Sequence, residues 1–507
     1  MGTSRRVVQL HKHAHASTLV LLAFIVGALG LSTFEPLPAT AASNTITVVD
    51  STGDVGRYSS LALDPSGNPV ISYYNYTFVS DTVHGYGPFV WPIGDLKLVH
   101  CGDPFCTGPE TPIVPDSTSD TLTRSFTTED TGLRTWLQLD SAGNPVVVYE
   151  HAHHFIPSNP FPPPSFPTGV AASYTLKVLR CNDTGCLGGD DDPVSVDLAA
   201  SSGLKRHPAF VLTDDSPTIV SAQWEVLQVM RCLDPICSTG DVSSPEGIQP
   251  SDWDYSLALD SAGLPVVSYL GFVGIQPDIT LLYCNDPACA GGDEVITRVA
   301  QLPVGNLDSF ATSLALDDSE RPTIAYYSDE AGALRIARCG DPVCVNGNTI
   351  VSVGAGGAHN SLRLDAQGNP VISYHSFGAL HVYRCGNPTC TSGNTISVAD
   401  AGGDVGAYTS LVLDASGNPV VSYYDAANGN LKLLRCGDPT CNGVPAPPVH
   451  ILQEPASPTP TPASVGGLSY QGESRGGPSA YLLLASIGAA VLVAVAGWFV
   501  VTQARTR

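Results

Sequence analysis

The sequence predicts an all-β fold, a seven-bladed β-propeller of four-stranded blades, followed by one C-terminal transmembrane helix. Three features of the 507-residue chain support this prediction. One unit is repeated seven times, each unit holds four short strand-like runs, and a single long apolar stretch lies near the C-terminus. A repeat period near fifty residues is typical of propellers and solenoids.

Cysteine marks the repeat. All fourteen cysteines fall into pairs separated by four residues, and successive pairs start 80, 51, 52, 55, 46 and 51 residues apart. The pairs are Cys101 with Cys106, Cys181 with Cys186, Cys232 with Cys237, Cys284 with Cys289, Cys339 with Cys344, Cys385 with Cys390 and Cys436 with Cys441. A gap of this length, with Asp-Pro or Asn-Pro in most copies, forms a tight turn that brings the two cysteines within bridging distance. We therefore predict seven local disulfides. Metal binding is the alternative, but zinc pairs are spaced more closely and need further converging ligands.

Four short runs in each unit predict its strands. In the last unit they cover residues 410–414, 420–424 and 431–435, and a β-branched run such as 394–398 fills the space between one cysteine pair and the next unit. Each run has four to six residues and is bounded by Gly, Pro, Asn or Asp, which is typical of strands and turns. No repeat sustains a helical period, so we expect few helices.

The N-terminal segment predicts how the ring closes. Residues 44–50 resemble the fourth strand of a unit, yet no first, second or third strand precedes them. They are expected to supply the outer strand of the last blade, and residues 449–452 are a second candidate for that edge. An open solenoid is the competing architecture. Solenoids usually carry atypical capping repeats, whereas the first and last units here are the two most alike.

A recurring hairpin carries a resemblance to known propellers. An Asp ends the first strand in six units, and Pro opens the second strand in all seven; the six residues are Asp64, Asp140, Asp260, Asp317, Asp365 and Asp414. An Asp side chain can cap the amides of such a turn while Gly takes the positive φ. This D-x-x-G-N-P hairpin resembles the turns of bacterial extracellular propeller repeats of the NHL and sialidase kinds, and the likeness covers all seven units.

The sialidase resemblance brings no catalytic residues with it. Sialidases use an arginine triad and a Tyr/Glu nucleophile pair. Five arginines of this chain directly precede a repeat cysteine, where repeat register explains them: Arg180, Arg231, Arg338, Arg384 and Arg435. Tyr recurs at one strand position in six units, which indicates packing: Tyr73, Tyr149, Tyr269, Tyr326, Tyr374 and Tyr423. No serine-hydrolase elbow or zinc-protease helix motif is present.

The two ends of the chain predict export and membrane attachment. Residues 1–41 have basic residues, an apolar stretch and a small-residue cleavage site, as in a signal peptide. The propeller is expected over residues 42–452 and a Pro/Gly/Ser-rich stalk over 453–480. Residues 481–501 are 21 apolar or small residues, about 31 Å of helix, which is enough to cross a bilayer. Basic residues in the tail, 502–507, place it in the cytoplasm. The predicted location is the cell membrane, with a single-pass anchor and a monomeric extracellular domain.

Acidic charge narrows the choice of partners. The chain has 23 basic and 47 acidic residues, a net charge of −24, so nucleic acid is not an expected partner. Acidic groups such as Asp190–Asp192, Asp50/Asp54 and Asp400/Asp404 offer oxygen ligands for Ca²⁺, the one cofactor considered. No complete calcium-loop motif is present, and turn formation is the alternative role of these residues.

Two insertions distinguish the first two units from the others. Residues 75–94 and 150–172 are added between the second and third strands, on neighbouring blades. Aromatic, variable loops on a rigid scaffold are common binding sites. The candidate ligand-binding residues are Tyr76, Tyr86, Phe89, Trp91, His151, His153 and Phe155. Alternatively, the two loops pack on each other and cover the mouth of the propeller.

The histidines of the second insertion also raise the possibility of a metal site. His151 and His153 fall on one face of an extended strand, with His154 beside them and Glu150 nearby. Two of these residues with one ligand from elsewhere would suit Zn²⁺. A solvent-exposed histidine-rich loop without metal is the alternative.

These features predict a non-catalytic binding or adhesion module, anchored at the cell surface and engaging carbohydrate or protein through the insertion face. The alternative is an extracellular hydrolase or lyase that acts on glycans at the same face. A third hypothesis is a structural envelope protein without a small ligand. Nothing in the sequence identifies catalytic residues.

Overall fold

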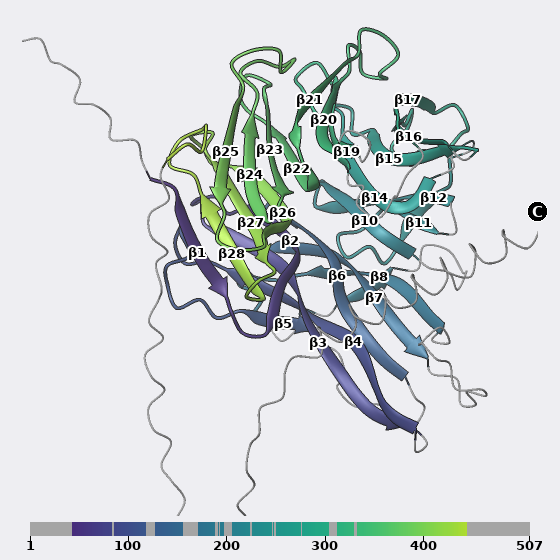
Figure 1. Ribbon diagram of the computed structural model, residues 1–507. Coiled ribbons are helices and arrows are strands. Elements are labelled where there is room, and N and C mark those ends of the chain that lie inside the picture. The colour runs from purple at the N-terminus through teal and green to yellow at the C-terminus, as the bar shows by residue number, and fades with distance from the viewer. Residues whose placement is uncertain are drawn as a thin grey trace, which may run out of the picture. The chain divides into compact units, whose positions relative to one another are not determined.

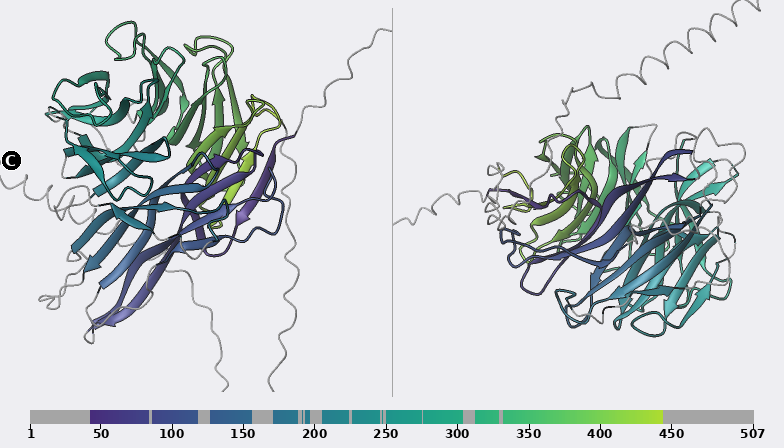
Figure 2. Two further views of the ribbon diagram at one scale, coloured as in Figure 1. Left: turned by 180° about the vertical axis from the view of Figure 1, so that it is seen from behind. Right: turned by 90° about the horizontal axis from the view of Figure 1, so that it is seen from below.

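The computed structural model describes residues 43–443 except 84–85, 118–126, 156–170, 188–190, 192, 197–204, 224–225, 246, 248–249, 275, 304–311 and 329–331. These residues belong to one compact unit, Met1–Ile451, and the second unit, Leu452–Arg507, lies outside them. The described residues form 28 β-strands and contain no helix. The strands make seven antiparallel sheets of four strands each (Figure 1). Figure 2 shows the same sheets from behind and from below.

Each sheet is one blade, and the chain builds the blades in sequence. Blade one holds β2 (Asp54–Leu63), β3 (Pro69–Val83), β4 (Tyr86–His100) and β5 (Ile113–Asp116). Blade two holds β6 (Thr127–Leu139), β7 (Pro145–Phe155), β8 (Ala171–Arg180) and β9 (Val194–Val196). Blade three holds β10 (Lys205–Thr213), β11 (Ser216–Gln223), β12 (Val226–Cys232) and β13 (Gly240–Ser243). Blade four holds β14 (Pro250–Leu259), β15 (Pro265–Val273), β16 (Gln276–Tyr283) and β17 (Val295–Gln301).

The remaining blades follow the same plan. Blade five holds β18 (Thr312–Leu316), β19 (Pro322–Ser328), β20 (Ala333–Arg338) and β21 (Thr349–Ala355). Blade six holds β22 (Ala358–Leu364), β23 (Pro370–Ser376), β24 (Ala379–Arg384) and β25 (Thr395–Asp400). Blade seven holds β26 (Val405–Leu413), β27 (Pro419–Asp425), β28 (Asn430–Arg435) and β1 (Thr45–Asp50).

The first strand of every blade faces the axis, and these inner strands form a closed circle. Each contacts the inner strand of the next blade, and β26 of blade seven contacts β2 of blade one. The ends of the chain are joined by antiparallel pairing of β1 with β28, in which Thr45 lies opposite Arg435. The predicted seven-bladed propeller is confirmed, and so is the role of residues 44–50. The second candidate for that edge, residues 449–452, lies outside the described residues.

Short polar side chains connect neighbouring inner strands. The Ser60 hydroxyl of blade one accepts a 2.9 Å hydrogen bond from the Leu137 amide of blade two. The same bond recurs between the other neighbours that carry serine here: Leu61 to Ser410, Leu314 to Ser256, Leu362 to Ser313 and Leu411 to Ser361. Each bond satisfies a buried amide that would otherwise cost about 1–3 kcal/mol. The repeated serines therefore set the spacing of the blades.

The repeated aspartate binds two kinds of group in its own blade, the amides of the turn and a basic side chain of the third strand. In blade one the Oδ1 atom of Asp64 accepts hydrogen bonds from the amides of Ser66 and Asn68, at 2.8 and 2.9 Å. Its Oδ2 atom lies 3.0 Å from Nε2 of His100, the residue before the cysteine. Arginine takes the place of that histidine in the pairs Arg180–Asp140, Arg338–Asp317, Arg384–Asp365 and Arg435–Asp414. The structural role predicted for these four arginines is confirmed.

A buried tyrosine, lysine and aspartate connect one blade to the next. Asp50, at the end of β1 in blade seven, accepts hydrogen bonds from Tyr73 (2.7 Å) and Lys97 (2.9 Å) of blade one. The same arrangement joins Asp116 to Tyr149 and Lys177, and Asp400 to Tyr423 and Lys432. All six repeat tyrosines are at most 1% exposed. Their predicted packing role is confirmed.

The seven predicted disulfides are confirmed, one at the end of the third strand of each blade, and no cysteine is free. The two Cα atoms of each pair are 4.8–5.0 Å apart, within the range that a disulfide spans. The bonds join Cys101 to Cys106, Cys181 to Cys186, Cys232 to Cys237, Cys284 to Cys289, Cys339 to Cys344, Cys385 to Cys390 and Cys436 to Cys441.

The second cysteine of each pair has a backbone conformation that the sequence did not predict. Its φ is positive, between 50° and 58°, a region that non-glycine residues enter rarely. The turn explains it: in blade one the Asp103 carbonyl accepts a 3.1 Å hydrogen bond from the Cys106 amide, which closes the loop tightly. The same conformation recurs in every blade, at Cys106, Cys186, Cys237, Cys289, Cys344, Cys390 and Cys441.

The predicted signal peptide, stalk, transmembrane helix and tail lie outside the described residues. In the part of the chain that the structure describes, no helix is long and apolar enough to span a membrane.

Removing one disulfide should weaken the fold without abolishing it. The double substitution Cys436→Ala, Cys441→Ala frees a short loop, so we expect a loss of about 2 kcal/mol from the chain-entropy model. Chemical denaturation measures the loss, and far-UV circular dichroism checks that the sheets persist. Loss of the β-sheet spectrum at 25 °C would contradict the view that the disulfides only reinforce a fold made by the blades.

Asp50→Asn should destabilise the protein by about 3 kcal/mol at neutral pH, because it leaves the Lys97 ammonium group buried beside a neutral amide. Burial raises the pKa of Asp50, but hydrogen bonds from Thr52, Lys97 and Tyr73 outweigh it and hold the pKa below its usual value. This stabilisation is complete above about pH 4, the unfolded value, and is lost as the pH falls through the lowered folded value.

Denaturation curves of wild type and Asp50→Asn between pH 2 and pH 7 test this. The difference between the two proteins should shrink below about pH 4. Asp404→Asn is the matched control, since this side chain is 64% exposed, and we expect a change below about 0.5 kcal/mol. A difference between wild type and Asp50→Asn that does not vary with pH would contradict the prediction.

Candidate functional site

Four inner strands share a distortion of the backbone. Tyr58, Arg134, His359 and Tyr408 have φ between 51° and 54°, a conformation that non-glycine residues adopt rarely. The ladder of each of these strands has a β-bulge at this point. Bulges redirect side chains and are frequent beside functional sites.

A glycine two residues earlier makes each distortion possible. The four are Gly56, Gly132, Gly357 and Gly406, all with positive φ. A Cβ atom on Gly56 would lie only 2.8 Å from the Cα atom of Leu431 in the preceding blade. Gly132, Gly357 and Gly406 approach Leu96, Leu334 and Leu380 in the same way. These positions therefore require glycine both for backbone conformation and for close contact with the neighbouring blade.

The four distorted residues lie next to one another, and we call them the axial arc. The ring centroids of Tyr58 and Tyr408 are 4.4 Å apart, and those of Tyr408 and His359 are also 4.4 Å apart. The guanidinium carbon of Arg134 lies 5.5 Å from the centre of the Tyr58 ring. The arc thus runs over blades two, one, seven and six, which are consecutive around the ring. All four residues are partly exposed.

Buried groups hold the arc from behind. Glu150 is fully buried, and its Oε2 atom lies 2.8 Å from Nη1 of Arg134. The Tyr74 ring lies 6.2 Å from that of Tyr58, and its hydroxyl donates to Asp130 at 2.8 Å. Arg134 is therefore positioned by a buried ion pair, and Tyr58 by the ring of a buried tyrosine that is itself hydrogen-bonded.

A second cation extends the arc on blade one. The Nη2 atom of Arg57 lies 2.8 Å from Asp54, and the same guanidinium group stacks 4.2 Å from the centre of the Tyr76 ring. Tyr424 donates a 2.6 Å hydrogen bond to Asp54. Tyr76, a residue predicted from the sequence, thus lies beside the arc through Arg57.

Tyr58, Tyr74 and Tyr424 are neutral at physiological pH. Burial, followed by its bond to Asp54, raises the pKa of Tyr424 to about 12. Burial also raises the pKa of Tyr58, with a further contribution from Tyr408, and that of Tyr74, with a further contribution from Asp130. These hydroxyls serve as hydrogen-bond donors and acceptors, and none is poised as a phenolate nucleophile.

Where the structure describes them, the insertions of blades one and two are strands and not irregular loops. β3 and β4 continue past the ends of neighbouring strands as a long hairpin, and β7 pairs with β8 as far as Phe155 (Figure 1). Of the other predicted residues, Tyr86, Phe89, Trp91 and Phe155 belong to these strands, but their side chains lie outside the described part. Only Tyr76, His151 and His153 can be placed in full.

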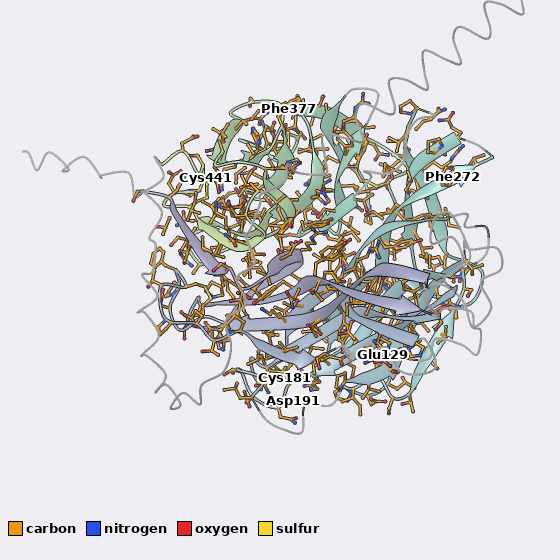
Figure 3. The ribbon with its side chains drawn as sticks, turned by 60° about the horizontal axis from the view of Figure 1, so that its bottom comes forward. Glu129, Cys181, Asp191, Phe272, Phe377 and Cys441 are labelled. Atoms are coloured by element: carbon orange, nitrogen blue, oxygen red, sulfur yellow. A yellow bond between two sulfur atoms is a disulfide. The ribbon has the colours of Figure 1, made fainter. Side chains whose placement is uncertain are left out.

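Shorter hairpins on the same end also carry aromatic residues. Phe377, in the turn between β23 and β24, is 89% exposed and has a φ of 49°. Phe272 lies near the tip of the β15–β16 hairpin. Both are at the outer edge of the ribbon in Figure 3. Phe377 therefore holds an apolar ring in solvent at the tip of its hairpin.

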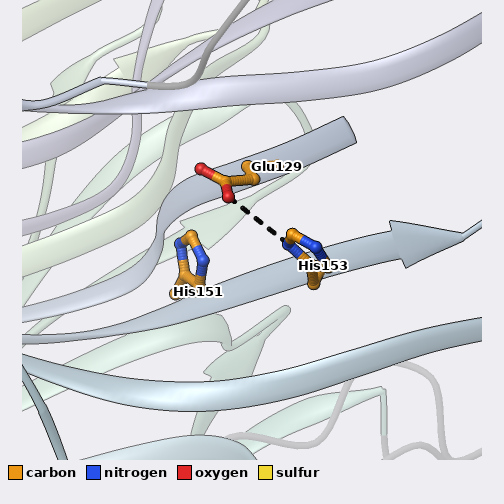
Figure 4. A group of neighbouring side chains, drawn as sticks. All are labelled: Glu129, His151 and His153. Carbon is orange, nitrogen blue, oxygen red and sulfur yellow. Dashed lines mark ion pairs between the residues drawn. The ribbon is translucent and has the colours of Figure 1, made fainter. Parts of the chain in front are cut away.

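The two predicted histidines point toward a glutamate that the sequence did not single out. His151 and His153 on β7 lie beside Glu129 on β6 (Figure 4). Burial, with the charge of Lys177, lowers the pKa of His151 to about 4, so its imidazole is neutral at physiological pH. Glu150, which the sequence suggested as a nearby ligand, instead pairs with Arg134.

The acidic residues considered for calcium have other partners where they are described. Asp50 and Asp400 each accept hydrogen bonds from a tyrosine and a lysine. Asp404 lies 3.1 Å from His375. Asp190 and Asp192 lie outside the described residues. Calcium binding remains a prediction.

The axial arc was not predicted from the sequence, although it has a sequence signal. Around the four bulges the sequence is Gly-Arg-Tyr-Ser-Ser, Gly-Leu-Arg-Thr-Trp, Gly-Ala-His-Asn-Ser and Gly-Ala-Tyr-Thr-Ser. Each reads Gly, any residue, then Tyr, Arg or His, followed by two mostly hydroxylic positions. The motif follows only from aligning the units upstream of the hairpin.

The sequence matches no protein-family model and no curated protein. Among solved structures, a protein of unknown function from Dyadobacter fermentans is similar at 12% identity and a TM-score of 0.42, over 78% of this chain and 98% of that one. The NanB sialidase of Streptococcus pneumoniae is similar at 10% identity and a TM-score of 0.38, over 77% and 69%. A Trypanosoma rangeli sialidase is similar at 9% identity and a TM-score of 0.37, over 75% and 54%. None of these values assigns a site residue or an activity to this chain.

The ion pair behind the arc can be tested by a double-mutant cycle. Arg134→Met leaves a buried carboxylate without its cation, and Glu150→Gln leaves the guanidinium group without its anion. We expect each substitution to cost about 3 kcal/mol. The double variant should cost about 1–3 kcal/mol less than their sum. Chemical denaturation of the four proteins measures this, and additive losses would show that the pair does not position the arc.

Proposed function

We propose that this protein is a non-catalytic binding or adhesion module that holds carbohydrate on the axial arc. The observation that carries the proposal is the arc itself: two tyrosines, a histidine and an arginine, all partly exposed and in contact around the axis. They occupy the end of the propeller at which blades one and two extend their hairpins.

The chemistry of the arc suits a sugar. A sugar ring has apolar C–H faces and hydroxyl edges, and tyrosine and histidine offer a flat apolar ring with a polar group at its rim. Arg134 adds fixed hydrogen-bond donors. Because Glu150 opposes the Arg134 charge and Asp54 opposes that of Arg57, neutral or weakly charged sugars are the expected ligands.

The backbone supports a functional origin of the arc. Each left-handed non-glycine residue costs of order 1–3 kcal/mol, and such residues cluster at ligand sites. Here the same strain is present in four blades and presents Tyr, Arg, His and Tyr. Glycine at these positions would relieve the strain. The presence of polar and aromatic side chains there instead favours a role in binding.

A glycan-active hydrolase or lyase on the same face is the alternative. It needs a carboxylic acid and a base free to act on the substrate. Of the buried carboxylates behind the arc, Glu150 pairs with Arg134 and Asp130 accepts from Tyr74. This use of the carboxylates favours binding over catalysis.

Display at the cell surface is part of the proposal. It rests on the sequence: the signal peptide of residues 1–41, the stalk of residues 453–480 and the apolar span of residues 481–501. In this arrangement the propeller lies outside the cell, in agreement with its seven disulfides.

A glycan array probed with the purified full chain in detergent tests the proposal. We expect selective binding, weakened about tenfold or more by Tyr408→Ala, because this ring contacts two other arc rings. Phe105→Ala is the control: it removes a 42% exposed aromatic ring at the cysteine turn, on the opposite end of blade one. Its binding should equal that of wild type.

Three results would change the conclusion. A silent array contradicts a carbohydrate ligand and leaves a protein partner or a structural role. Equal losses in the two variants would place binding elsewhere. Mass spectrometry of the retained glycans covers the third result: cleavage that disappears in Glu150→Gln would favour the enzyme.

A further inference from the structure

Three potential metal ligands converge on the paired strands of blade two. Glu129 on β6 lies directly opposite His153 on β7, and His151 is two residues earlier on β7, opposite Thr131. Alternate residues of a strand point to the same face. One ligand atom from each of the three lies within 4.8 Å of the others (Figure 4).

The spacing of these atoms suits tetrahedral zinc. Zinc binds imidazole nitrogen and carboxylate oxygen at about 2.0–2.2 Å, so two ligands of a tetrahedral ion lie about 3.3–3.5 Å apart. Nδ1 of His153 and Oε1 of Glu129 are 3.5 Å apart. This separation is long for a hydrogen bond but matches one edge of a zinc tetrahedron. A ligand atom of His151 lies within 4.8 Å of the ligand atoms of both other residues.

One ring nitrogen of His151 lacks a hydrogen bond. Its Nδ1 atom is buried and has no hydrogen-bond partner among the described residues. Buried polar atoms are bonded in the large majority of cases. Ligation of a metal ion by this nitrogen would satisfy it.

The surrounding charges permit a dication. Lys177 on β8 is a cation whose charge acts on His151, and its Nζ atom lies 2.8 Å from Asp116. Asp116 also accepts a hydrogen bond from Tyr149, at 2.6 Å. The lysine charge is therefore opposed locally, and Glu129 supplies a negative charge at the site itself.

We propose that Glu129, His151 and His153 form a zinc site, with two imidazole nitrogens, one carboxylate oxygen and a fourth position open to water. Histidine and carboxylate ligands with one open position are a common zinc arrangement in proteins. The ion would connect β6 to β7 beyond the bulge of Arg134. The site is independent of the carbohydrate proposal, since none of its ligands belongs to the arc.

Zinc binding by the metal-free full chain tests the proposal. Equilibrium dialysis against Zn²⁺ with elemental analysis should give one ion per chain, and competition with a chromogenic chelator gives the affinity. Glu129→Gln and His153→Gln should each weaken binding about a hundredfold or more, since even the loss of a residue that only orients a ligand costs about 10–100-fold. Zinc K-edge absorption should show imidazole and oxygen ligands and no sulfur.

His375→Gln is the matched control. His375 also faces a carboxylate, at 3.1 Å from Asp404, but the described residues around it supply no third ligand. This variant should bind zinc as wild type does. Thermal denaturation without zinc should give similar midpoints for all variants, and added zinc should raise the midpoint of wild type and His375→Gln only.

Two results would overturn the proposal. The first is the absence of stoichiometric zinc on the folded wild-type chain. The second is binding that survives in both Glu129→Gln and His153→Gln, as binding by the histidines before residue 43 would. If a ligand variant has a lowered midpoint without zinc, the absorption spectrum of the wild type decides, because sulfur ligands or fewer than two imidazoles would exclude this site.

Discussion

Antiparallel pairing of β1 with β28 is the constraint on which the rest of the structure depends. It joins residues near the two ends of the propeller and brings blade seven against blade one. Tyr58 then contacts Tyr408, with ring centroids 4.4 Å apart. Asp50, at the end of β1, accepts hydrogen bonds from Tyr73 and Lys97. If the ring were open, both the buried ion pair and the centre of the axial arc would be lost.

The repeat separates the residues that build the blades from those that distinguish them. Serine on the inner strand, aspartate at the hairpin and tyrosine on the second strand have the same partners in blade after blade, because each blade meets its neighbour in the same geometry. The side chain two residues after the bulge glycine has no such recurring structural partner. This position holds Tyr58, Arg134, His359 or Tyr408 in four blades, and these side chains meet around the axis. A repetitive scaffold thus presents a varied surface at one end.

The alternation of side chains along β7 gives the second blade two separate roles. Successive side chains of β7 point to opposite faces of the sheet. Glu150 is buried behind the arc and binds Arg134, while His151 and His153 face Glu129 on the other side. A single strand can therefore support the proposed carbohydrate site and the proposed zinc site without sharing a residue between them.

The repeat, the four strands of each blade and all seven disulfides could be predicted from the sequence alone, which also named residues 44–50 as one of two candidates for closing the ring. These features follow from local sequence. A turn between two cysteines is encoded within six residues, and the same pattern occurs in each unit. The sequence also singled out His151 and His153 by their alternation. It did not identify Glu129, whose place opposite His153 depends on the register of β6 against β7.

Which side chains meet at the axis follows from the folded chain and from no local pattern in the sequence. Tyr58 and Tyr408 are 350 residues apart, and Arg134 and Glu150 lie on strands whose bulges shift the register. No local sequence pattern predicts how far a bulge turns a side chain or which blade that side chain will face. Those facts come from closing the ring, because closure alone places the ends of the inner strands around one axis.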